Sequence, residues 1–276
     1  MPRPLRNYCL LSALLFTFLL CLHTLAQAHQ EQVQVAPPMR RIGPPPAEWN
    51  ADQLEKQADE LRAHKGYLDA LDYYDAALTK VPKAANLQSA VLQNKIGITN
   101  LQLQRFGDAR KHFQRSIKLN KQYADAYNNL GVIFYLGKKY SKAIKQYQKA
   151  LSFTPNSASF YSNLGAAHFS KKEFEKAMLA YSKALELDPD ILQRTSATGV
   201  TAQMSSPEDR AHYDYVVAKM YARLGVNERS LEYLRKAMEE GYKDVKDVYT
   251  DPEFAELRKD ARFAELMKMK PMAIPE

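Results

Sequence analysis

The residues with the greatest capacity for metal binding or nucleophilic catalysis are six histidines and two cysteines. The histidines are His23, His29, His64, His112, His168 and His212. A zinc site on one helix needs a spacing such as HxxxH or HExxH, and no two of these histidines have it. The sequence also lacks the GxGxxG, GxxxxGK[ST] and GxSxG motifs of dinucleotide, phosphate and serine-nucleophile sites. We therefore predict no catalytic residue, no metal site and no cofactor.

Residues 1–28 contain both cysteines, Cys9 and Cys21, and have the order of a secretory signal peptide. Two arginines precede an apolar run at 9–22, and an A-x-A sequence ends at Ala28. The alternative is an uncleaved membrane anchor, but a spanning helix needs about 20 apolar residues and this run has 14. We predict export and cleavage after Ala28, which would leave a mature chain without disulfides or thiolates.

The chain is mildly basic, with 39 Lys and Arg residues against 31 Asp and Glu residues. In an exported protein this excess suits anionic envelope surfaces or acidic partner segments, and we expect no nucleic acid partner. The simpler alternative is a solvated surface that happens to be rich in lysine. No N-x-S/T sequon occurs, which favours a bacterial periplasmic or secreted setting over a eukaryotic one. Membrane contact is expected only through residues 1–28, if they are not cleaved.

Residues 29–50 are rich in proline and have little to bury, so we predict a disordered tether. Order should begin near Asn50, which can cap a helix with Gln53 three residues later. Beyond this point, five blocks of 34 residues can be laid in register, at 51–84, 90–123, 124–157, 158–191 and 211–244. A repeat of this length indicates one structural unit used five times.

Three positions stay small in every block, and a bulky position lies between the last two. The small column of the first helix is Ala58, Gly97, Gly131, Gly165 and Ala218. The bulky column of the second helix is Tyr74, Phe113, Tyr147, Tyr181 and Leu234. Two helices of about 14 residues and two short turns fill the period, so we predict helix pairs that approach at the small residues. The bulky residues are expected to fill the space between one pair and the next.

These columns resemble the tetratricopeptide repeat (TPR) family. The likeness covers roughly residues 51–244 and is strongest in the blocks at 124 and 158, where the order YNNLG…Y…A…Y…A…P is nearly complete. The block at 90 departs from the family pattern, because Lys121 stands where a proline is usual. The resemblance implies an all-α fold: a right-handed α-solenoid of about five helix-turn-helix repeats, with a concave groove lined by the first helices.

Two further segments lie outside the repeat pattern. Residues 192–210 are an insertion before the last block. We predict a loop or small hairpin over 192–205 and the start of a new helix at Ser206 and Pro207. Residues 245–276 should form short capping helices, because a solenoid needs its terminal apolar face covered. The residues expected to cover that face are Phe254, Leu257, Phe263 and Leu266.

The resemblance also places polar residues of the first helices on the wall of the groove. In some superhelical members an asparagine there holds the backbone of a bound peptide, because one amide can accept from N–H and donate to C=O. By position, Asn129 and Asn163 match that asparagine, and Lys95 supplies a cation beside them. The remaining candidate groove residues are Asn94, Asn128, Tyr135 and Phe169. The simpler alternative is that the polar side chains only keep the inner wall hydrated.

The sequence thus predicts an exported, non-enzymatic scaffold that binds a protein or peptide in its groove, within a bacterial envelope complex. The alternative is a structural subunit of a secretion, pilus or assembly complex that docks through its convex or terminal surface. Substitutions at Asn129 and Asn163 would abolish binding in the first case and would be silent in the second.

Overall fold

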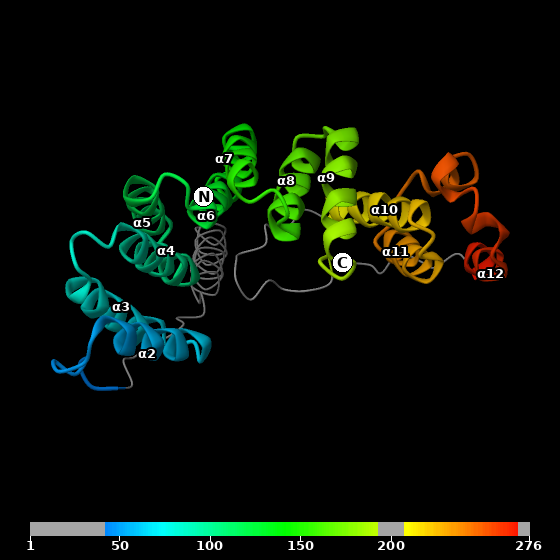
Figure 1. Ribbon diagram of the computed structural model, residues 1–276. Helices are drawn as coiled ribbons and strands as arrows, with labels where there is room; N and C mark the ends of the chain where they lie inside the picture. The colour runs from blue at the N-terminus through cyan, green and yellow to red at the C-terminus, as the bar shows by residue number, and fades with distance from the viewer. Residues whose placement is uncertain (1–41, 193–206, 270–276) are drawn as a thin grey trace, which may run out of the picture. The chain divides into compact units, whose positions relative to one another are not determined.

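The structure is a computed structural model that describes residues 42–192 and 207–269 (Figure 1). The predicted signal peptide, most of the predicted tether and most of the insertion lie outside these residues. The repeat helices are α2 (Ala51–Ala63), α3 (Tyr67–Lys80), α4 (Asn86–Gln102), α5 (Phe106–Leu119), α6 (Ala124–Leu136), α7 (Tyr140–Phe153), α8 (Ala158–Ser170), α9 (Phe174–Leu187), α10 (Pro207–Arg223) and α11 (Asn227–Glu239). The short helices η1 (Val245–Tyr249), η2 (Pro252–Phe254), η3 (Leu257–Lys259) and α12 (Ala261–Met269) follow.

Helices α2 to α11 form five consecutive pairs, and a turn of three residues joins the two helices of each pair (Figure 1). Each second helix also contacts the first helix of the next pair: α3 contacts α4, α5 contacts α6, α7 contacts α8 and α9 contacts α10. One buried apolar cluster runs from Ile98 on α4 to Leu266 on α12. The described residues therefore form an all-α solenoid of paired helices, as the 34-residue columns predict.

The small column of the first helix lies directly against the bulky column of its own pair. A Cβ atom added at Gly131 would lie 2.5 Å from Cε1 of Tyr147, whereas carbon atoms need about 3.5–4.0 Å. The equivalent approaches are Gly97 to Phe113 and Gly165 to Tyr181. We expected these rings between one pair and the next. The structure corrects this, because each ring fills the gap that the glycine opens within its own pair.

A residue in the left-handed conformation ends the first helix of each pair. These residues, with their φ angles, are Lys65 (63°), Gln104 (58°), Lys138 (55°), Lys172 (61°) and Gly225 (73°). The next N–H then bonds to a carbonyl five residues back, as Lys139 N does to Phe134 O at 2.8 Å. This hydrogen bond is the Schellman pattern, which closes the first helix and turns the chain back along it.

Both ends of the repeat array are capped, at the start of α2 and beside the α10–α11 pair. Asn50 Oδ1 accepts from the Gln53 N–H at 2.9 Å, and Gln53 Oε1 accepts from the Asn50 N–H at 3.0 Å, which completes a capping box at α2. At the other end, η2 contacts α10 and α12 contacts α11. The four apolar residues predicted to cover this end are all buried there: Phe254, Leu257, Phe263 and Leu266.

Candidate functional site

The four candidate asparagines form one buried hydrogen-bond ladder across α4, α6 and α8. Asn163 Nδ2 donates to Asn128 Oδ1 at 2.9 Å. Within α6, Asn128 Nδ2 donates to Asn129 Oδ1 at 3.2 Å. Asn129 Nδ2 in turn donates to Asn94 Oδ1 at 3.0 Å. None of the four residues is more than 4% exposed, so the ladder lies beneath the surface and ties three first helices together.

One repeat earlier, between α2 and α4, the contact that corresponds to the asparagine ladder is ionic. Lys95 Nζ lies 2.6 Å from Glu55 Oε1 and 2.5 Å from Asp59 Oδ2. Asp59 Oδ1 also accepts from the Tyr74 hydroxyl at 2.5 Å. Two carboxylates of α2 therefore already balance the candidate cation, whose side chain is 23% exposed. In the last repeat, buried Val216 occupies the position that corresponds to Lys95 and Asn129. The residue at this position is therefore charged, polar or apolar, depending on the repeat.

The ladder fixes the spacing of the first helices. An unpaired buried amide costs about 1–3 kcal/mol, so each ladder bond strongly favours the register in which its partners meet. An asparagine amide has two N–H donors and a carbonyl with two lone pairs, and the ladder uses only part of this capacity. Direct contact between these asparagines and a peptide stays a prediction. What the structure contains is a set of amides bonded to one another.

The two candidate aromatic residues are also buried. Tyr135 is 5% exposed and Phe169 is 2% exposed. The Tyr135 hydroxyl lies 2.9 Å from Ser170 Oγ on α8. The centroid of the Phe169 ring lies 5.3 Å from the ring centroids of both Phe174 and His212. Tyr135 therefore belongs to the contact between α6 and α8, whereas Phe169 borders a ring cluster that reaches α10.

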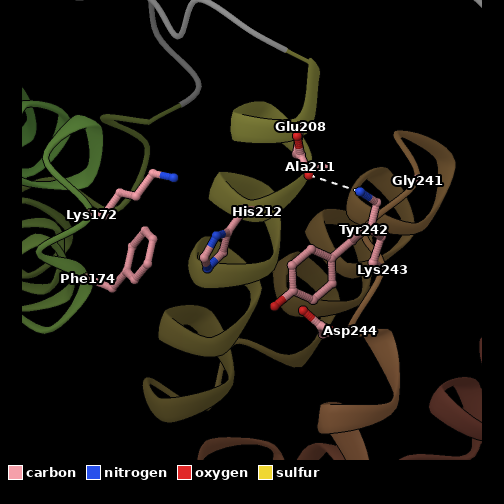
Figure 2. Close-up of a pocket in the computed structure, with 9 residues that line it drawn as sticks. All are labelled: Lys172, Phe174, Glu208, Ala211, His212, Gly241, Tyr242, Lys243 and Asp244. Atoms are coloured by element: carbon pink, nitrogen blue, oxygen red, sulfur yellow. Dashed lines mark hydrogen bonds and ion pairs between the residues drawn. The ribbon is translucent and has the colours of Figure 1, made fainter.

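A cleft opens beside this ring cluster, between the start of α9, the start of α10 and the chain that leaves α11 (Figure 2). Its volume is about 230 Å³. The lining residues are Lys172, Phe174, Glu208, Ala211, His212, Gly241, Tyr242, Lys243 and Asp244. His212 stands between the other two rings: its centroid lies 4.3 Å from that of Phe174 and 5.5 Å from that of Tyr242. We call this feature the aromatic cleft.

Charged side chains stand at the rim of the aromatic cleft. Lys243 Nζ lies 3.1 Å from Glu208 Oε1, and these two side chains are 81% and 80% exposed. Lys172 lies beside Phe174 on the opposite side in Figure 2. Burial raises the pKa of Tyr242 to about 12, so its hydroxyl is neutral at physiological pH. The aromatic cleft therefore combines apolar ring faces with charges of both signs at its edge.

The turn between α8 and α9 holds one wall of the aromatic cleft in place. Glu173 Oε1 lies 2.6 Å from Lys171 Nζ, and Glu173 Oε2 lies 2.6 Å from His168 Nδ1. Hydrogen bonds from Lys171 and His168 lower the pKa of Glu173 to about 2. Glu173 therefore stays ionised and anchored between Lys172 and Phe174, the two residues that this turn contributes to the aromatic cleft.

A carboxyl group with a strongly raised pKa lies on the same helix as His212. Burial, with the nearby Glu240 carboxylate adding to it, raises the pKa of Asp214 to about 7. Lys236 and Arg210 act in the opposite direction without cancelling the shift. Asp214 is therefore half-protonated near neutral pH, which makes the α10–α11 contact sensitive to pH.

Sequence reasoning singled out Phe169, which contacts two rings of the aromatic cleft, but missed every residue that lines the cleft. Its residues come from three short segments, 172–174, 208–212 and 241–244, and no motif links them. In the sequence, His212 has no second histidine at a metal-binding spacing, so no pattern drew attention to it. Folding brings the segments together, because α9 contacts α10 across the insertion and the left-handed Gly241 turns the chain back after α11.

The described part of the chain offers no arrangement for metal chemistry. Within residues 42–192 and 207–269, no three His, Cys, Asp or Glu side chains are grouped so that they could hold a metal ion. Over the same ranges, no helix has both the length and the apolar character needed to cross a membrane.

Comparison with known proteins finds the repeat at the sequence level. A family model described as "TPR repeat" matches residues 100–137 and 133–172, and one described as "Tetratricopeptide repeat" matches residues 158–191. A search of curated proteins finds no match to the chain. Residues 100–191 overlap three of the blocks laid out from the sequence, those at 90, 124 and 158.

Solved structures with a similar arrangement of helices are distant in sequence. A crystal structure of MamA is 22% identical, with a TM-score of 0.45, and covers 68% of this chain and 96% of that one. MamA from Desulfovibrio magneticus RS-1 is 18% identical, with a TM-score of 0.47 and coverage of 73% and 97%. YrrB, a TPR protein with an unusual peptide-binding site, is 18% identical, with a TM-score of 0.45 and coverage of 72% and 91%. The family matches within residues 100–191, together with the observed helix pairs, thus support the tetratricopeptide repeat family that the columns suggest.

Proposed function

We propose that this chain is a non-enzymatic scaffold that binds a partner polypeptide, and that the aromatic cleft receives one of the partner's side chains. The size of the cleft carries the proposal. Sites for small molecules have volumes of roughly 300–1,000 Å³, and this cleft has about 230 Å³. It is therefore better matched to a single side chain than to a whole cofactor or metabolite.

The lining of the aromatic cleft indicates which side chain it would take. The rings of Phe174, His212 and Tyr242 offer apolar and edge-to-face contacts that suit an aromatic or aliphatic residue. At the rim, Lys243 is paired with Glu208, and Lys172 on the opposite side suits a carboxylate close to that residue in the partner. The favoured ligand is thus a peptide with an apolar anchor next to an acidic residue.

The asparagine ladder supports this function through the wall that it holds. It joins α4, α6 and α8, and α8 ends beside Phe169, which contacts two rings of the aromatic cleft. Within the proposal, a longer partner segment would continue from the aromatic cleft along the first helices, where the groove residues predicted from the sequence lie.

The proposed setting is a bacterial envelope complex outside the cytoplasm. The order of basic, apolar and A-x-A residues within 1–28 supports export. Expression of the full chain in a bacterium, followed by mass measurement of the protein in the periplasmic fraction, tests this directly. We expect a chain that begins at residue 29. A full-length chain retained in the cytoplasm would contradict the proposed setting.

Peptide selection tests the binding function. Residues 29–276 are used as bait for a displayed peptide library, and the affinity of selected peptides is measured by calorimetry. We expect selected peptides to pair an apolar with an acidic residue, and Lys172→Glu to weaken their binding at least tenfold. A matched control is Leu179→Ala, which changes a 67% exposed side chain on α9 outside the cleft.

Each result has a defined meaning. Equal affinities for the bait, Lys172→Glu and Leu179→Ala would show that the aromatic cleft is not the site. A native envelope partner that binds all three equally would favour the alternative, a structural subunit that docks through its outer or terminal surface. His212→Ala provides a second test of the cleft, with circular dichroism to verify that the variant is folded.

A further inference from the structure

The positive charge of this protein is concentrated in one stretch of the repeats. Residues 105–149 contain eleven basic and only two acidic residues. The basic residues are Arg105, Arg110, Lys111, Arg115, Lys118, Lys121, Lys138, Lys139, Lys142, Lys145 and Lys149, and all of them are exposed. This stretch carries a surplus of nine positive charges, whereas the whole chain has a net charge of +8. The remainder of the chain is therefore close to neutral.

Two second helices carry most of these side chains in matching rows. Lys142, Lys145 and Lys149 are spaced by three and four residues and lie on the exposed face of α7. Arg115 and Lys111 stand 34 residues before Lys149 and Lys145, on the corresponding face of α5. The α7 row spans seven residues, or about 10 Å of helix. The α5 row spans four, because Asp108 stands at the position that corresponds to Lys142. We call these two exposed faces the basic face.

Ion pairs are scarce on the basic face compared with other second helices. The α7 helix contains no acidic residue. Among the described residues, the ion pair within 4 Å on these two rows is Lys111 with Asp108, at 3.1 Å, and Arg115 lies at longer range from Asp75 of α3. The α7 lysines thus have no acidic partner within 4 Å among the described residues. Lys142 and Lys149 lie 6.0 and 4.5 Å from the ring centroids of Phe134 and Phe153, contacts that leave their positive charge unneutralised.

The second helices of the next two repeats differ, because their lysines are paired. Lys183 Nζ lies 2.8 Å from Glu186 Oε2 on α9, and Lys236 Nζ lies 2.8 Å from Glu232 Oε1 on α11. Lys176 on α9 lies 3.8 Å from Glu173. The basic face is therefore a local feature of α5 and α7 and not a general property of these repeats.

Apolar side chains accompany the basic residues at the turns. Phe106, next to Arg105, is 45% exposed, and Leu136, two residues before Lys138, is 42% exposed. Basic side chains with a few exposed apolar ones match an anionic bilayer, which offers charged headgroups above an apolar layer. Phosphates of nucleic acid would satisfy the cations but would leave these apolar side chains without a partner.

We propose that the basic face docks this protein on the surface of an anionic lipid bilayer. Eight of the eleven basic residues are lysines, and lysine acts as a flexible point charge that does not require fixed acceptor geometry. A fluid layer of headgroups supplies charge in that form. This surface lies on different elements from the aromatic cleft, so the two can act independently and can fail independently.

Vesicle flotation tests the proposal with two variants of equal charge. The first is Lys142→Gln/Lys145→Gln/Lys149→Gln on the basic face. The matched control is Lys176→Gln/Lys183→Gln/Lys236→Gln, which removes three lysines that have acidic partners. The vesicles contain phosphatidylcholine alone or with about one third phosphatidylglycerol, at low and high salt. Circular dichroism establishes that both variants are folded.

We expect the native chain to float only with anionic vesicles, and to be released by high salt because screening weakens the attraction. Each basic residue near such a surface contributes about fivefold in affinity. The α7 variant should therefore bind about 100-fold more weakly, and the control variant should stay within about tenfold of the native chain. Absence of binding to anionic vesicles, or equal loss in both variants, would overturn the proposal. So would preferential binding of duplex DNA or a polyglutamate peptide in competition with vesicles.

Discussion

Replacement of Gly131 by alanine tests the packing that sets the repeat. The new Cβ would lie 2.5, 2.7 and 3.0 Å from Cε1, Cδ1 and Cζ of Tyr147. Restoring normal contact requires the ring to move by about 1 Å, yet the Tyr147 side chain is fully buried between Ala143 and Ala150, which are buried as well. Overpacking of this kind costs about 1–3 kcal/mol. The better helix propensity of alanine offsets about 0.8–1.0 kcal/mol of it.

The matched control for this substitution is Gly107→Ala on α5, where a Cβ would meet nothing within 4 Å. Gly107 lies in the first turn of α5, so its gain in helix propensity is at most that of Gly131 in the interior of α6. A lower midpoint for Gly131→Ala than for Gly107→Ala therefore reports the overpacking. In a chain of this size the expected 1–3 kcal/mol is about 2–12 °C in the midpoint of thermal unfolding. Circular dichroism of residues 29–276 and both variants measures it. Equal midpoints for the two variants would refute the packing described for Gly131 and Tyr147.

Three other substitutions have defined outcomes. Asn129→Ala should lower the free energy of unfolding in urea by about 2–6 kcal/mol, because it leaves two buried amide groups of the ladder without their partner. Asp214→Asn should be neutral at pH 4 and stabilising at pH 8. The folded carboxyl has a pKa of about 7, against 3.8 for an unperturbed aspartate, so native stability falls as the pH rises between these values. Thermal unfolding measured across this pH range would follow the change. Tyr147→Phe should stabilise by about 1–3 kcal/mol in the same urea assay, because the hydroxyl is buried and has no hydrogen-bond partner among the described residues.

The fold could be predicted from the sequence because packing constrains it at many positions at once. Gly131 and Tyr147 recur in type at 34-residue intervals, and the helices had to bring those columns together. What the columns could not tell was on which side of the second helix the ring lies. Both arrangements fill a gap, and only the backbone geometry shows that the glycine faces the ring of its own pair.

The site was predicted less well than the fold, for a different physical reason. Asn129 and Asn163 were correctly placed on the first helices, but a sequence does not show whether an amide faces a ligand or another amide. Their partners lie 35 residues away, and the pairing depends on the offset between neighbouring first helices. The aromatic cleft also forms from segments that lie far apart in the sequence, so no local spacing of residues could predict it.

The hydrogen bonds between first helices close loops of nearly the same length. Gln88 with Asp52 and Lys95 with Asp59, which join α4 to α2, are 36 residues apart. Asn94 with Asn129, Asn128 with Asn163 and Tyr135 with Ser170 are each 35 residues apart. The entropy cost of closing a loop depends on its length, so each added repeat docks at the same cost, whatever has already folded. The mean sequence separation of contacting residues then stays constant as repeats are added. The folding rate then depends on the docking of one repeat onto its neighbour. The number of repeats can therefore change in evolution without making the chain slower to fold.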